Sequence, residues 1–293
     1  MLSRADVDPR IIRLYDEYTH RPLERRVFLE RLAGLAGSAA AAYALLPLLE
    51  NNYALAAIVD PADGRVATSR IMYKGASGDV RGYLATPKPG AAKRAGVIVI
   101  HENRGLNPHI EDVARRVALE GFTALAPDLL TPVGGTPIDE DAARAAIGKL
   151  DRNEAARNLV AAVAYLKSRS DATGRVGAVG FCWGGGMANV LAVQAPDLTA
   201  AVPFYGLVAP TADVPKIKAK LQLHYAANDA RINAGIAEYE AALKAAGVAY
   251  EKHIYEGTEH AFHNDTGAAR YNKAAAELAW SRTIAFFKTN LRA

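Results

Sequence analysis

The stretch that decides the fold is Gly180-Phe181-Cys182-Trp183-Gly184-Gly185-Gly186. The apolar run Arg175–Phe181 predicts a buried strand, and Gly184–Gln194 predicts a helix directly after it. Between a strand and a helix, Gly-x-Cys-x-Gly is typical of a sharp turn that presents a nucleophile, here with cysteine in place of serine. The start of the helix offers backbone N–H groups and a positive dipole end, which favour a thiolate. The alternative is a glycine-rich turn around a buried, inert cysteine.

Strand and helix signals alternate on both sides of this turn, from about residue 66 onward. Further strands are predicted at Val66–Tyr73, Val80–Ala85, Ala95–His101, Phe122–Ala126, Ala200–Phe204, Lys220–Ala226 and Ala249–Tyr255. Further helices are predicted at Ile110–Glu120, Pro137–Gly148, Glu154–Ser168, Ile232–Ala246 and Ala268–Lys288. This alternation predicts an α/β fold, with a mostly parallel central sheet and helices on both faces. We expect one catalytic domain over residues 61–293, preceded by an extension over residues 1–60.

The composition is that of a globular protein and gives no sign of a nucleic-acid-binding, disulfide-bonded or metal-binding protein. The 293 residues are 51% hydrophobic and 23% charged, as in an ordinary globular chain. The net charge of +4 comes from 35 basic and 31 acidic residues without a run of five like charges, so no nucleic-acid partner is predicted. A single cysteine cannot form an internal disulfide or a multi-thiolate metal site, and no His-Glu-x-x-His pattern is present. We therefore expect neither a metal nor another cofactor.

The extension has two interpretations that the sequence leaves open. Residues 9–31 predict a charged, amphipathic helix, and Leu32–Leu49 is apolar but interrupted by Pro47. Arg25-Arg26 before the apolar part and Ala54-Leu55-Ala56 after it resemble a twin-arginine export signal over residues 25–56, which would place the protein in the periplasm. Alternatively, the segment is retained in a cytoplasmic protein as helices that dock on the body or form a homodimer. The apolar part is too short and mild for a stable membrane span.

Candidate partners of Cys182 follow it in the order acid, then base, that a nucleophile on such a turn requires. Asp229 follows the strand Lys220–Ala226 and is the predicted acid, although it can also cap the next helix. His260 lies in the loop after the last strand and is the predicted base, with His263 as its competitor. The other histidines fit less well, His20 because it lies in the extension.

The loop after the strand Ala95–His101 contributes the remaining candidates. Its backbone supplies the second oxyanion-hole N–H in this architecture, so we assign the two donors to Asn103 and Trp183. Glu102 stands beside the nucleophile and could keep the resting thiol protonated until substrate arrives. The simpler alternative is that Glu102 pairs with Arg104 or caps the helix after Pro108.

These motifs resemble the dienelactone hydrolase (carboxymethylenebutenolidase) family of α/β-hydrolases, over roughly residues 66–290. The resemblance rests on His101-Glu102-Asn103-Arg104-Gly105, Gly180-Phe181-Cys182-Trp183-Gly184-Gly185, Phe204-Tyr205-Gly206, Asp229 and His260-Ala261-Phe262. It implies a Cys-Asp-His triad, a glutamate in contact with the nucleophile and an oxyanion-hole amide at Asn103. Family members that act on dienelactone hold the substrate carboxylate with arginines, one of them shortly after the catalytic histidine, where this chain has none. Arg104, Tyr205 and Arg231 are the substrate-binding candidates.

The predicted function is hydrolysis of a small ester or lactone by Cys182 through a thioester acyl-enzyme. Two alternatives stay open. The same triad also suits a thioesterase or an acyltransferase. A protein that keeps the fold without catalysis would instead use the extension as an interaction surface.

Overall fold

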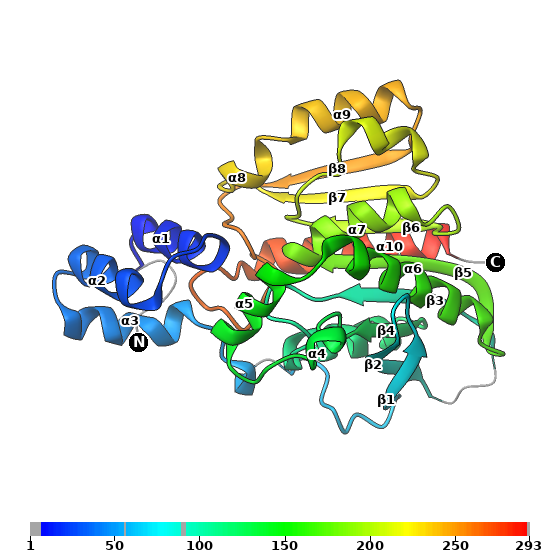
Figure 1. Ribbon diagram of the computed structural model, residues 1–293, viewed down its shortest axis with the longest axis horizontal. Helices are drawn as coiled ribbons and strands as arrows, with labels where there is room; N and C mark the ends of the chain where they lie inside the picture. The colour runs from blue at the N-terminus through cyan, green and yellow to red at the C-terminus, as the bar shows by residue number, and fades with distance from the viewer. Residues whose placement is uncertain (1–6, 56, 89–91, 292–293) are drawn as a thin grey trace.

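The computed structural model describes residues 7–55, 57–88 and 92–291. A twisted sheet forms the centre of the molecule, helices cover both of its faces, and a group of three helices extends at one end (Figure 1). The strands are β1 (Val66–Lys74), β2 (Asp79–Pro87), β3 (Arg94–Ile100), β4 (Thr123–Pro127), β5 (Ala172–Phe181), β6 (Ala200–Phe204), β7 (Lys220–Ala226) and β8 (Tyr250–Tyr255). The longer helices are α1 (Pro9–His20), α2 (Arg25–Ala36), α3 (Ala39–Leu49), α4 (Pro108–Leu119), α5 (Glu140–Lys149), α6 (Arg152–Ser168), α7 (Trp183–Gln194), α9 (Ile236–Ala245) and α10 (Lys273–Asn290). Shorter turns of helix are α8 (Ala230–Asn233), η2 (Tyr53–Leu55), η3 (Thr131–Val133) and η4 (Thr211–Lys216).

The sheet has the strand order β1-β2-β4-β3-β5-β6-β7-β8. β2 runs antiparallel to both of its neighbours, and every pair from β4 to β8 is parallel. The buried parts of the central strands are apolar because both faces of a parallel sheet are covered, whereas β3 begins with Arg94 and the first half of β5 contains the exposed Arg175. The predicted α/β fold is thereby confirmed. Since parallel strands end at one edge of the sheet, the loops after β3, β5, β7 and β8 meet there.

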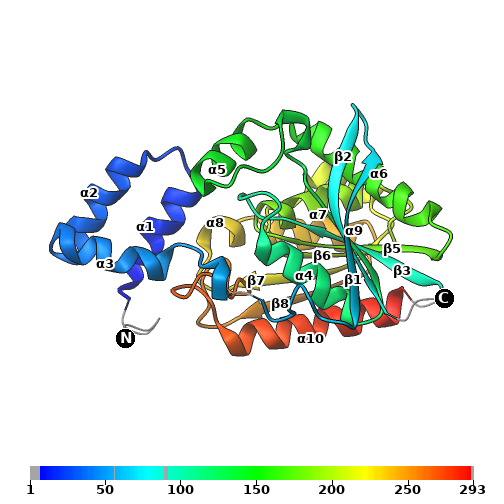
Figure 2. The same cartoon turned by 90° about the horizontal axis from the view of Figure 1, so that it is seen from below.

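Two apolar cores lie on opposite faces of the sheet. α6, α7 and α9 pack on one face. α4 and α10 pack on the other, and Figure 2 shows α10 running along that side of the molecule. Cys182 belongs to the second core, so its backbone is anchored in tightly packed apolar surroundings.

Helices α1, α2 and α3 form a small unit with its own apolar core, which we call the arm (residues 9–49). Phe28 and Leu32 are fully buried within it, and Tyr18 stacks on Phe28 with a ring-centroid distance of 4.3 Å. The single helix predicted over residues 9–31 is wrong, because the chain turns at Arg21–Glu24, around Pro22, and starts a second helix at Arg25. Likewise, the helix predicted over Ile232–Ala246 is divided into α8 and α9.

The arm packs against the body of its own chain. The Arg144 guanidinium donates to the Tyr18 carbonyl at 2.6 Å, and the Tyr18 hydroxyl donates to Asp141 at 2.6 Å. On the other side, the amide of Ala269 donates to the Leu48 carbonyl at 2.9 Å. The arm is therefore attached both to α5 and to the long loop that precedes α10. A homodimer through this segment stays a prediction.

Within the described ranges, no single helix is long and apolar enough to cross a membrane. α2 and α3 meet the length and composition of a span only when taken together, and they are bent by 109° where they join. The export-signal interpretation stays a prediction, and Ala56, the last residue of its small-x-small motif, lies outside the described residues.

Candidate active site

Cys182 occupies the sharp turn between β5 and α7. Its backbone has φ +55° and ψ −115°, a conformation that residues other than glycine rarely adopt. A Cβ at Gly180 would lie 2.1 Å from the Gly184 carbonyl oxygen, and one at Gly184 would lie 2.4 Å from the His101 carbonyl oxygen. Both positions thus require glycine for the turn to close. Such strain, held by surrounding structure, is typical of functional positions.

Asp229 and His260 meet at the same edge of the sheet. Asp229 follows β7, His260 follows β8, and His260 Nδ1 lies 2.5 Å from Asp229 Oδ2. Both side chains are almost fully buried. Because the carboxylate accepts from Nδ1–H, the Nε2 atom of His260 is left free, and it has no hydrogen-bond partner of its own. The ligand atoms of His260 and Cys182 lie within 4.8 Å of each other.

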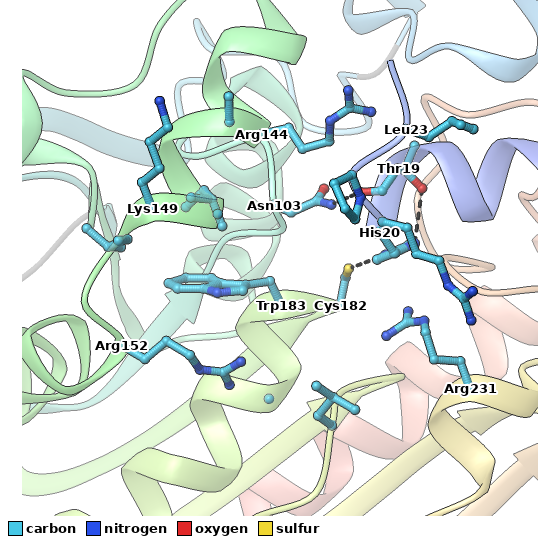
Figure 3. A pocket seen from close by; sticks show the side chains of 18 of the residues that line it. Thr19, His20, Leu23, Asn103, Arg144, Lys149, Arg152, Cys182, Trp183 and Arg231 are labelled. Carbon is cyan, nitrogen blue, oxygen red and sulfur yellow. Dashed lines mark hydrogen bonds between the residues drawn. The ribbon is translucent and has the colours of Figure 1, made fainter. Parts of the chain in front are cut away.

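A second histidine reaches Cys182 from the arm. His20, the last residue of α1, places its Nε2 3.2 Å from the Cys182 Sγ (Figure 3). Its ring meets that of His260 edge-on, with centroids 4.5 Å apart. Our expectation that His20 fits the site poorly is therefore wrong. The contact depends on how the arm docks, which no local pattern in the sequence reports. A carboxylate four residues earlier, Asp16, on the same helical face is the one signal that singles out this histidine.

The charges around Cys182 favour its thiolate. Burial raises the pKa of the thiol, but His260 and His20 outweigh burial and hold that pKa well below its usual value. Burial likewise lowers the pKa of His260, yet the charges on Cys182 and Asp229 raise it to about 10. The pKa of His20 is also raised, because Cys182 and Asp16 outweigh its burial. These directions favour a thiolate beside imidazolium groups, which is the arrangement that activates a cysteine nucleophile.

The loop after β3 lies beside the nucleophile. Glu102 is 5% exposed and accepts from the Asn264 side-chain amide at 2.6 Å, while its other oxygen, Oε1, is buried without a hydrogen-bond partner. The Asn103 side chain donates to the Thr19 carbonyl at 2.8 Å, which ties this loop to the arm. The hydrogen bond at Cys182 is made by His20 rather than by Glu102. Gating of the thiol by Glu102 stays a proposal, and it would act through the negative charge of the carboxylate rather than through a hydrogen bond to the sulfur.

The remaining candidates differ in their surroundings. Arg104 is buried and lies 3.4 Å from the carboxylate of Glu140, so its charge is already paired within the chain. Tyr205 is fully buried with φ +35°, and its ring meets His260 edge-on at 5.0 Å. The competitor His263 stacks on Phe181, and burial with the nearby Arg116 charge holds its pKa well below the usual value.

A cavity of about 860 Å³ opens in front of Cys182, with residues of the arm, of α5 and of α7 in its wall (Figure 3). Arg152 and Arg231 approach the space beside Cys182 and Trp183 from opposite sides (Figure 3). The Nε and Nη2 atoms of Arg231 are buried and have no hydrogen-bond partner. Unsatisfied guanidinium donors of this kind are suited to an anionic group on a bound molecule.

His20, Cys182 and His260 are also the one group among the described residues whose side chains could together hold a metal ion. Thiolate and imidazole are ligands that Zn²⁺ prefers. The same proximity is what a cysteine nucleophile with histidine partners requires.

Comparison with known proteins assigns the family. The model of the dienelactone hydrolase family matches residues 80–291, more than half of the chain. The chain belongs to the dienelactone hydrolase family. A second model, described as YqhI-like, matches residues 1–37. Membership confirms the resemblance found in the sequence, and the protein is a hydrolase of this family.

Individual relatives agree with this assignment. The chain is 34% identical over 254 residues to a protein of Saccharolobus solfataricus named "Putative carboxymethylenebutenolidase", covering 74% of this chain and 97% of that protein. A protein of the same name from Methylorubrum extorquens is 30% identical over 284 residues, covering 92% of this chain and 96% of that protein. Among solved structures, the "Putative Dienelactone Hydrolase" of Klebsiella pneumoniae has a TM-score of 0.70 at 27% identity, covering 76% of this chain and 98% of that one.

Proposed function

We propose that the protein hydrolyses a carboxylic ester or lactone with Cys182 as the nucleophile, through a thioester acyl-enzyme. The observation that carries this proposal is the strained, glycine-flanked turn that holds Cys182 within 4.8 Å of a histidine paired with Asp229. That arrangement supplies an activated sulfur and a base whose orientation is fixed by a carboxylate.

The reaction has two halves. The Cys182 sulfur attacks the substrate carbonyl carbon, and the oxyanion that forms is stabilised by the N–H groups of Asn103 and Trp183. The carbon–oxygen bond to the leaving group then breaks, and the His260 imidazolium gives its proton to the leaving oxygen. Water next loses a proton to neutral His260 and attacks the thioester carbon. The carbon–sulfur bond breaks, the acid leaves, and the thiolate and the imidazolium are restored.

The cavity favours an anionic substrate. Its wall contains one carboxylate, Glu24, and five basic residues: Arg21, Arg144, Lys149, Arg152 and Arg231. Arg231 is the best placed of these, because two of its nitrogen atoms are buried without a partner. Arg104 does not suit this role, because Glu140 already pairs with it. We therefore assign recognition of a substrate carboxylate to Arg231.

A panel of esters and lactones, each in an anionic and a neutral version, tests the proposal. Cys182→Ala should abolish hydrolysis, and intact-protein mass spectrometry of the wild type after rapid acid quenching should show one added acyl group that the variant lacks. Arg231→Gln should raise KM for the anionic compounds and leave KM for the neutral ones unchanged. Equal hydrolysis by wild type and Cys182→Ala would rule out the nucleophile.

A further inference from the structure

The arm contributes an imidazole to the catalytic centre. We infer that His20 takes and holds the proton of the Cys182 thiol, so that His260 is left to act on the leaving oxygen and on water. This inference rests on the proposed function, and it makes His20 a catalytic residue because the imidazole contacts the reacting sulfur. The site is then shared between the body, which supplies Cys182, Asp229 and His260, and the arm.

Hydrogen bonding fixes the tautomer of His20. Its Nδ1 lies 2.9 Å from the Asp16 backbone carbonyl and 3.1 Å from the Asp16 carboxylate. The Thr19 hydroxyl is also 3.1 Å from Nδ1, but it donates its own hydrogen to the Asp16 carbonyl. A carbonyl oxygen can only accept, so Nδ1 must carry a hydrogen. The Nε2 atom that faces the Cys182 sulfur is therefore the basic nitrogen of the neutral ring, and it can receive the thiol proton directly.

The two histidines are built alike. Each has a carboxylate near Nδ1: Asp229 is hydrogen-bonded to His260, and Asp16 lies within ion-pair distance of His20. Each also directs Nε2 toward the region of Cys182. A carboxylate at Nδ1 stabilises the imidazolium that forms when Nε2 takes a proton. His20 has the closer contact with sulfur, whereas Nε2 of His260 has no hydrogen-bond partner and is available to a bound substrate or to water.

The docked arm leaves the site accessible. Thr19, His20 and Leu23 form part of the wall of the large cavity, and Cys182 lines that cavity while His20 contacts it (Figure 3). The contact therefore coexists with room for a substrate. It also holds the oxyanion-hole residue, because Asn103 donates to the Thr19 carbonyl. The contacts of the arm with Cys182 and Asn103 are those expected if the arm is a permanent part of the active site.

With two imidazoles, every proton that moves during the catalytic cycle has a donor and an acceptor. Before substrate binds, the thiol proton passes to Nε2 of His20, which leaves a thiolate beside an imidazolium balanced by Asp16. His260 enters the cycle protonated, gives its proton to the leaving oxygen, and regains one from the attacking water. When the acid leaves, the electrons of the carbon–sulfur bond return to sulfur, and His20 still holds its proton.

The test measures the rate at which iodoacetamide alkylates Cys182 as a function of pH, in the full-length protein. In the wild type, the rate should stay high well below the usual pKa of a thiol. In His20→Ala, the apparent pKa of alkylation should rise by about 1–3 pH units, the effect of losing an adjacent opposite charge. The His260→Ala variant also loses a positive charge near the sulfur, so its alkylation pKa should rise as well. That rise should be smaller than in His20→Ala, because the contact of His20 with the sulfur remains, and turnover should be lost. Arg26→Gln, an exposed change on α2, serves as the matched control and should behave as the wild type.

Chemical rescue separates a chemical role of His20 from a structural one. Activity of His20→Ala should fall about 10²-fold or more, and added imidazole, which can enter the cavity, should restore part of it. His20→Gln, which keeps a polar side chain, should show the same rise in the alkylation pKa. An unchanged alkylation profile in both His20 variants, or a larger rise of the alkylation pKa in His260→Ala than in His20→Ala, would overturn the inference. If Cys182→Ala remained active, the proposed function would fail, while the alkylation profiles would still decide the role of His20 toward the thiol.

Discussion

The side-chain amide of Asn264 lies 2.6 Å from Oε2 of Glu102, so the loop that carries His260 also holds the carboxylate beside the nucleophile. Glu102 and Cys182 line the same small cavity, together with both histidines. The second oxygen of Glu102, Oε1, has no hydrogen-bond partner. A negative charge on this carboxylate, in the same cavity as the sulfur, would disfavour the thiolate, in opposition to the two imidazoles.

Replacing this carboxylate should release the thiol. Glu102→Gln keeps the shape of the side chain and an acceptor for Asn264 but removes a negative charge. We expect the pKa of Cys182 to fall, and iodoacetamide labelling below neutral pH to accelerate by about tenfold for each unit of that shift. Glu277→Gln, on the exposed face of α10, is the control. Identical labelling rates with and without Glu102 would show that the carboxylate does not gate the thiol.

Asp229 has two roles that one substitution separates. It accepts from His260 through Oδ2 and caps α8 by accepting from the Ile232 amide through Oδ1 at 3.2 Å. Asparagine caps helices as well as aspartate does, so Asp229→Asn should change the thermal midpoint little. It cannot stabilise an imidazolium, so kcat/KM should fall by about 10²–10⁴-fold. A large loss of stability with activity retained would contradict a role for Asp229 in catalysis.

The pH dependence of hydrolysis should report His260. Its pKa is raised to about 10, so the imidazolium that protonates the leaving oxygen is present below that pH and is lost above it. We therefore expect kcat/KM to decline as the pH rises through about 10. In Asp229→Asn the decline should begin at lower pH, since Asp229 is one cause of the raised pKa. An alkaline limb at the same pH in both proteins would show that this limb belongs to another group.

The body of the protein could be predicted from its sequence because the decisive signals are local. Apolar runs such as β3 and β5 report buried parallel strands whatever surrounds them. The order of Cys182, Asp229 and His260 at strand ends likewise follows from the chain alone, since parallel strands end at one edge. The sequence thus predicted which loops meet, and the structure brings those three residues together.

The contribution of the arm could not be predicted in this way. His20 and Cys182 are 162 positions apart, and their contact depends on tertiary hydrogen bonds such as those of Tyr18 with α5. Those bonds involve single polar side chains without any periodic pattern. Arg104 is a substrate-binding candidate in the sequence for the same reason: its partner within the chain leaves no local pattern. Its pairing with Glu140 is visible only after α5 has folded against the loop that follows β3.

The glycines of the nucleophile turn provide the last prediction. A Cβ at Gly180 would lie 2.1 Å from a backbone carbonyl oxygen, a contact that no rotamer change can relieve. Gly180→Ala should therefore displace the turn, lower the free energy of unfolding by roughly 1–3 kcal/mol or more, and remove most of the activity.

Gly34→Ala is the matched control, because Gly34 lies within α2 and no atom lies within 4 Å of the position that its Cβ would take. There alanine should stabilise the protein by about 0.5–1 kcal/mol, since glycine is the poorer helix former. Denaturant unfolding and hydrolysis, measured on both variants, check the pair, and an active Gly180→Ala protein with wild-type stability would mean that Cys182 does not need this tight turn.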